Sequence, residues 1–138
     1  MIKIFLKNWE ELKRHKCIFA REIRFRQKRI DLIQIPLYKN KRLGTAHAIE
    51  FKLKNWRECF KQAKKNRLFM PKNTIAIWKN HISKVIKEEL IDEGIGLIEV
   101  SYEKNRTILK PQQNPYIDKL IYFKLRKQII KEEMGKKN

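Results

Sequence analysis

Two charged residues, Glu50 and Lys52, stand two positions apart in the segment TAHAIEFKL, residues 45–53. The segment reads as a buried central strand, and strand side chains alternate between two faces, so the two groups share one face, about 7 Å apart at their bases. Carboxylate oxygens bind hard divalent cations, and an adjacent amine can orient water or stabilise developing negative charge. The pair suits metal-assisted hydrolysis, but taken alone it is better explained as an ion pair at the exposed end of a strand, so the other candidate residues decide between the two interpretations.

Two further polar residues lie on the elements expected to flank this strand. Asp31 opens a nearly continuous apolar run within residues 29–37, a pattern typical of a strand covered on both faces. Gln62 lies on a helix that follows the Glu50 strand, beside Cys59 and Asn66 on the flank of the apolar stripe. Both side chains are therefore placed to face the Glu50 strand.

An Asp that opens one strand of a hairpin, Glu-x-Lys in the next strand and a helical Gln-Ala after it resemble the PD-(D/E)XK nuclease superfamily. The resemblance covers residues 19–100 and departs from the pattern at Ile30, which stands where a proline often precedes the Asp. It implies an α/β fold with a restriction-endonuclease-like core, in which a central mixed sheet is flanked by helices in the order αβββαβ.

The resemblance also implies a role for each candidate residue. Asp31 and Glu50 would hold a magnesium or manganese ion, and the backbone carbonyl of Phe51 would add a third oxygen ligand. Lys52 would orient or help activate the attacking water, or stabilise negative charge. Gln62 would position Lys52, the water or a phosphate by hydrogen bonding.

An additional glutamate often assists the metal in this superfamily, and three residues compete for that role here. Glu22 lies on the expected strand before Asp31, with an ion pair to its arginine neighbours as the alternative. Glu10 and Glu11 follow Asn8 in a pattern better explained by helix capping and the helix dipole. The cysteines and histidines show no metal-binding spacing, so neither zinc nor a small-molecule cofactor is expected.

The net charge is the strongest compositional signal, because 34 Lys and Arg against 15 Asp and Glu give +19. Such a field attracts polyanions, and counterion release makes DNA the leading partner, with anionic lipid or a merely solvated surface as alternatives. The resemblance favours a homodimer, since a small nuclease often pairs to cut both strands. The residues expected to contact nucleic acid are Lys28, Arg29, Lys39, Lys41, Arg42, Lys54, Lys61 and Lys65.

The 138 residues predict a single domain, and no apolar run approaches the length of a membrane span. The apolar start is too short and too quickly acidic for a secretory signal, so we expect an intracellular protein. The last helix would either cover the sheet or form a dimer surface. Strands are expected at residues 17–25, 29–37, 45–53, 73–80, 94–101 and 102–109, and helices at 8–16, from 55 onward, at 81–91 and at about 114–133.

The function that these features predict is a magnesium-dependent endodeoxyribonuclease, with a junction-resolving enzyme as one member type. Double-stranded, single-stranded, branched and RNA substrates all remain open, since charge carries no sequence or structure preference. The alternative is a basic nucleic-acid-binding protein that retains the nuclease fold without cutting. A third interpretation is a protein-interaction subunit that docks through its C-terminal helix.

Overall fold

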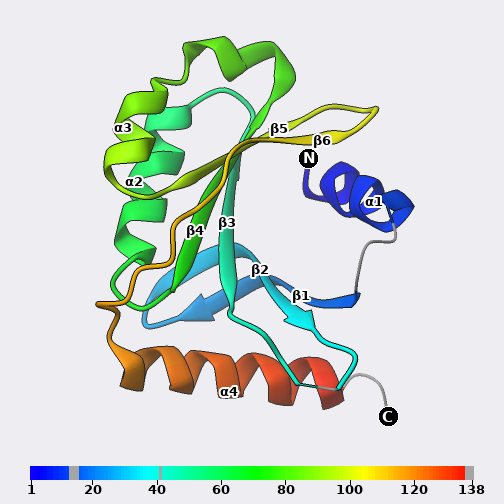
Figure 1. The fold of residues 1–138 in the computed structure, drawn as a ribbon, viewed down its shortest axis with the longest axis vertical. Coiled ribbons are helices and arrows are strands. Elements are labelled where there is room, and N and C mark those ends of the chain that lie inside the picture. The colour runs from blue at the N-terminus through cyan, green and yellow to red at the C-terminus, as the bar shows by residue number, and fades with distance from the viewer. Residues whose placement is uncertain (13–15, 41, 136–138) are drawn as a thin grey trace.

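The computed structural model of the chain describes residues 1–12, 16–40 and 42–135, and these form one six-stranded mixed sheet flanked by helices (Figure 1). The chain is therefore of the α/β class, and its first six elements follow the order αβββαβ. The elements are α1 (Ile2–Leu12), β1 (Lys16–Phe25), β2 (Lys28–Leu37), β3 (His47–Lys52), α2 (Trp56–Asn66), β4 (Lys72–Trp78), the 3₁₀ helix η1 (Lys79–Lys84), α3 (Lys87–Asp92), β5 (Gly96–Val100), β6 (Asn105–Leu109) and α4 (Lys119–Gly135).

The strands lie in the sheet in the order in which they occur along the chain, β1-β2-β3-β4-β5-β6. The β1–β2, β2–β3 and β5–β6 pairs are antiparallel, whereas β3, β4 and β5 run parallel. Parallel neighbours need a crossover, which α2 supplies between β3 and β4, and η1 with α3 between β4 and β5. The carboxyl ends of β3, β4 and β5 consequently meet at one edge of the sheet.

Helices cover both faces of the sheet, and three groups of buried side chains fill the space between (Figure 1). Side chains of α4, among them Tyr122 and Leu125, pack with β1 and β2. Trp56 and Phe60 of α2 pack with β4 and β5. Phe5 of α1 packs on the opposite face with residues of β2, β3 and β4. The Glu50 side of β3 is therefore the side covered by α2.

The start of α2 follows its local sequence signal closely. Asn55 is the N-cap, its side-chain oxygen accepts the backbone N–H of Glu58, and its amide donates to the Glu58 carboxylate at 3.2 Å. The first of these bonds satisfies a backbone donor that the first helical turn leaves unpaired, and the second holds the Asn55 side chain in the capping position. Local capping thus sets the point at which α2 begins and the direction in which its residues face.

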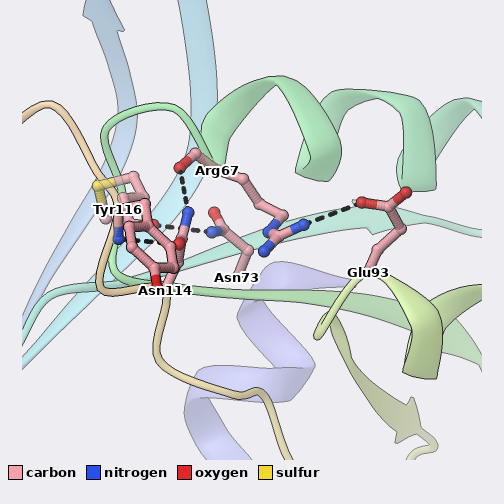
Figure 2. A network of polar contacts seen from close by, with 6 residues as sticks. Arg67, Asn73, Glu93, Asn114 and Tyr116 are labelled. Carbon is pink, nitrogen blue, oxygen red and sulfur yellow. Dashed lines mark hydrogen bonds and ion pairs between the residues drawn. The ribbon is translucent and has the colours of Figure 1, made fainter.

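The end of α2 is fixed by longer-range contacts, drawn in Figure 2. The Arg67 guanidinium pairs with Glu93 at 2.9 Å, and the Arg67 backbone carbonyl accepts from the Asn114 side chain at 3.0 Å. The Asn114 carboxamide oxygen in turn accepts the backbone N–H of Tyr116 at 3.1 Å. The segment before α4 and the segment after α3 therefore hold the last turn of α2, which carries Asn66.

Three helix boundaries differ from those expected. α1 begins at Ile2, and Asn8 lies buried within it, donating to the Ser101 carbonyl and to Asn105 at 3.0 Å each. α4 begins at Lys119, because residues 114–118 form a tethered segment that ends in the capping residue Asp118. Residues 81–91 divide between η1 and the short α3.

Within the described ranges, no helix is long and apolar enough to cross a membrane.

Candidate functional site

The site begins where β2 separates from β3. The last paired residues of this ladder are Leu32 and Ile49, one position before Asp31 and Glu50 would pair in the same register. Beyond that point the backbone N–H of Phe51 donates to Asp31 Oδ2 at 2.9 Å, so the carboxylate replaces a ladder partner. In a strand the N–H and C=O of one residue point to the same side, so the Phe51 carbonyl also faces the gap beside Asp31.

Glu50 is buried to 1% exposure next to this gap. Its Oε1 accepts a hydrogen bond from the Asn66 amide at 2.9 Å, and its backbone carbonyl accepts one from the Cys59 thiol at 3.2 Å. Its Oε2 is buried and receives no hydrogen bond from a donor in residues 1–12, 16–40 and 42–135. A buried carboxylate oxygen left without a partner is expensive, because desolvation is not compensated.

The electrostatics of Glu50 follow from this position. The pKa of its carboxyl is raised from 4.5 to about 8. Burial is the largest cause and the charge of the neighbouring Asp31 is the second, whereas the hydrogen bond from Asn66 opposes the rise. The Asp31 carboxylate therefore lies close enough to disfavour the ionisation of Glu50. Either a shared proton or a bound cation relieves that repulsion.

The donor set fits a magnesium-type ion. Two carboxylates and a backbone carbonyl are hard oxygen ligands, and magnesium commonly uses one or two carboxylates and completes its shell with water. Across residues 1–12, 16–40 and 42–135, no three His, Cys, Asp or Glu side chains gather as a metal-binding group. A cation at this point would therefore be held by Asp31, Glu50 and the Phe51 carbonyl.

The structure brings Lys52 to the same neighbourhood without pairing it to an acid. Lys52 is half-buried on the Glu50 face of β3. Burial raises the pKa of the Cys59 thiol well above its usual value, and the charges of Glu50 and Asp31 raise it further. The Ala76 backbone and the Lys52 charge oppose that rise, so Lys52 and the two carboxyl groups lie close enough to act on the same buried thiol. Glu50 and Lys52 do not form an ion pair, because the Glu50 carboxylate is buried against Asn66. The ion pair nearest to the site instead joins Arg29 to Asp31 at 3.7 Å.

Gln62 and Glu22 occupy the expected elements, and their roles stay predictions. Gln62 is half-buried on α2 between Cys59 and Asn66, on the flank that faces β3. Glu22 is exposed and has a φ of 51°, a strained conformation for a residue with a side chain. It lies opposite Asp31 in the β1–β2 register, because the pairs on either side are Arg21 with Leu32 and Ile23 with Ile30.

Asn66 is the residue that sequence reasoning did not assign. It ends α2, is buried, and fixes one oxygen of Glu50. Its position four residues after Gln62 was the available signal, since i and i+4 share a helix face. A buried amide that orients a carboxylate leaves the other carboxylate oxygen free to bind a ligand.

The expected nucleic-acid contacts divide into two groups. Lys28 and Arg29 lie just before Asp31 on β2. The exposed Lys61 and Lys65 lie on α2, and the exposed Lys54 lies in the connection between β3 and α2. Lys39 and Arg42 instead lie beyond the far end of β2, about 20 Å along the strand from Asp31 at 3.3 Å per residue. Lys41 falls outside the described residues. Four of these basic residues therefore lie on β2 or α2 and a fifth joins β3 to α2, whereas the hairpin loop is remote from the site.

Comparison with known proteins adds a likeness in fold. No known family profile and no curated protein matches the chain. A solved structure of a protein of unknown function from Silicibacter pomeroyi is similar, with a TM-score of 0.63 and 14% sequence identity over 96% of this chain and 85% of that one. At that identity the likeness concerns the arrangement of helices and strands alone.

Proposed function

We propose that this protein is a metal-dependent nuclease that hydrolyses phosphodiester bonds in DNA, on a restriction-endonuclease-like core. The observation that carries the proposal is the buried Glu50 Oε2 without a partner, beside the Asp31 carboxylate and the gap between β2 and β3. The αβββαβ element order, with Glu-x-Lys in the third strand, supports the same conclusion.

In this proposal Asp31, Glu50 and the Phe51 carbonyl hold a magnesium or manganese ion. The ion would neutralise phosphate charge and lower the pKa of bound water. Asn66 keeps the Glu50 carboxylate in one orientation through its 2.9 Å hydrogen bond. Lys52, which pairs with no acid among the described side chains, would orient water or stabilise charge that develops on the phosphate.

The charge of the chain supports a nucleic-acid substrate. A net charge of +19 on 138 residues draws polyanions over several ångströms and raises association rates. Lys28 and Arg29 precede Asp31 on the same strand, so phosphate contacts there would place a backbone beside the carboxylates. A homodimer, which would bring two such sites to a duplex, belongs to the same proposal.

The direct test is divalent-dependent cleavage of supercoiled, single-stranded and branched DNA. Glu50→Gln and Asp31→Asn should abolish cutting while leaving binding in EDTA largely intact. Glu99→Gln is the control for loss of a buried strand glutamate, because Glu99 lies on the same face of the sheet two strands away, on β5, and pairs with Arg106 at 3.1 Å. Cutting by Glu50→Gln at the wild-type rate would show that the assignment of the site is wrong.

A second candidate is a nucleic-acid-binding protein that keeps this fold without cutting. The raised pKa of Glu50 favours it, since a protonated Glu50 can donate its hydroxyl to Asp31 and satisfy both carboxyls without a cation. Magnesium would then neither stabilise the protein nor change its affinity for DNA beyond ordinary salt screening. Thermal unfolding with and without magnesium at constant ionic strength separates the two candidates.

A further inference from the structure

An aromatic pair lies at the sheet edge where the parallel strands end. Trp78 ends β4, and Tyr102 follows β5 in the turn to β6. Their rings meet edge to face, with centroids 4.9 Å apart and an interplanar angle of 80°. Trp78 is half-buried against the α1 side of the core, whereas Tyr102 is 74% exposed. An exposed tyrosine ring is therefore held in one place by a buried partner.

The turn that carries Tyr102 is itself tied down. Ser101 is buried, its backbone N–H and its hydroxyl donate to the Lys104 carbonyl at 3.0 Å each, and its hydroxyl accepts the Lys104 N–H at 3.2 Å. Asn8 of α1 donates to the Ser101 carbonyl, so α1 fixes the turn from below (Figure 1). The ring is thus presented by a rigid turn, which reduces the entropy lost when a ligand stacks on it.

Basic residues flank the aromatic pair. Lys79 follows Trp78, Lys104 ends the turn, and both are exposed. Glu103 precedes Lys104 in the turn. Its pKa is lowered chiefly by a hydrogen bond from its own backbone and also by the nearby Ser101, Lys79 and Lys104. An exposed ring between two lysines matches the pattern of surfaces that stack an unpaired base and hold its phosphates.

We propose that Tyr102, supported by Trp78 and flanked by Lys79 and Lys104, is a stacking platform for an unpaired nucleobase of single-stranded nucleic acid. The inference rests on the proposed function for its partner class and adds a substrate preference. Lys52 pairs in register with Ile77, the residue before Trp78, so the candidate site and the platform lie at the same sheet edge. The candidate site and the platform lie on opposite faces of the sheet at this edge. A single strand of nucleic acid that passes around the edge would therefore contact both.

The test is binding of fluorescein-labelled fifteen-nucleotide oligo(dT), with oligo(U) and a duplex of equal length as further arms, measured by anisotropy in EDTA. Tyr102→Ala should weaken single-strand binding roughly five- to a hundredfold and duplex binding less than about twofold. Tyr102→Phe keeps the ring and should bind like the wild type. Tyr116→Ala is the matched control, since Tyr116 is 91% exposed, lies outside the platform and contacts no ring in the part of the chain that the structure describes.

Charge variants test the phosphate part separately. Glu103→Gln removes the acid between the lysines and should tighten single-strand binding. Replacing Lys79 and Lys104 together by Ala should reduce the slope of log affinity against log salt by about 1.4, at 0.7 per phosphate contact on a single strand. Circular dichroism and thermal unfolding establish that each variant folds.

Two outcomes would overturn the platform. Tyr102→Ala could bind oligo(dT) as tightly as the wild type, or could lose single-strand and duplex binding equally while folded. Either result is independent of the nuclease assignment, because binding is measured without divalent ions. Loss of cutting in Glu50→Gln together with unchanged binding in Tyr102→Ala would retain the nuclease and reject the platform. The reverse combination would retain a single-strand binder that does not cut.

Discussion

Replacing Glu50 by Gln should make the metal-free protein more stable at high pH. The folded-state pKa of about 8 lies above the ordinary 4.5, so between these values the folded state binds more protons than the unfolded state. The free energy of unfolding of the wild type therefore falls as pH rises from 4.5 to 8. The difference in pKa corresponds to an upper limit of about 5 kcal/mol at 1.36 kcal/mol per pKa unit.

The Gln variant escapes this loss because it is neutral at every pH. Its amide oxygen can keep the hydrogen bond from Asn66, and its amide nitrogen can donate to the Asp31 carboxylate. At pH 5 the two proteins should be within about 1 kcal/mol, and at pH 9 the variant should be about 2 to 5 kcal/mol more stable. Urea unfolding in EDTA, followed by fluorescence of the three tryptophans, measures both.

Magnesium should narrow the stability advantage of the variant at high pH. The wild type should gain about 2.7 kcal/mol at a magnesium concentration a hundred times its Kd, and the variant should gain nothing. Glu99→Gln should lose stability at both pH values, because it breaks an ion pair with Arg106. Parallel pH profiles for the wild type and Glu50→Gln in EDTA would refute the assignment of a buried, destabilised carboxyl.

Three further variants probe the rest of the site. Asn66→Ala should raise the pKa of Glu50 still further, since it removes a hydrogen bond that opposes the rise, and should cost about 1–3 kcal/mol of stability. The pH dependence of urea unfolding measures both effects, and a profile like that of the wild type would contradict this prediction. Lys52→Met should bind magnesium and DNA yet cut roughly a hundredfold more slowly or worse, and single-turnover kinetics at wild-type rates would exclude Lys52. Lys28→Ala with Arg29→Ala should slow cleavage and lower its salt dependence more than Lys39→Ala with Arg42→Ala, and equal effects in cleavage assays across a salt series would place the hairpin loop at the substrate.

Features set by local sequence were predictable. The alternation of residues 45–53 placed Glu50 and Lys52 on one face, and Asn55 with Glu58 marked the start of α2. Both depend only on strand periodicity or on contacts three residues apart. The mixed α/β class followed from the same alternation of strand and helix patterns.

Features set by distant contacts were not predictable. Asn8 resembles an N-cap, yet it lies inside α1 because Ser101 and Asn105, more than ninety residues away, satisfy its amide. The bond from Asn66 to Glu50 spans 16 residues and depends on how far α2 extends before Arg67 is tethered. The point at which β2 separates from β3 lets the Phe51 N–H donate to the Asp31 carboxylate. The sequence of neither strand alone indicates where this separation occurs.

The central claim is that Asp31 and Glu50 share a divalent cation, and its most direct test is a manganese soak of crystals at pH 7.5 with anomalous diffraction. We expect one manganese peak within about 2.5 Å of Glu50 Oε2 and of an Asp31 oxygen, with the Phe51 carbonyl or water completing the shell. A map without that peak at saturating manganese, with the two carboxyls hydrogen-bonded to each other, would contradict the claim.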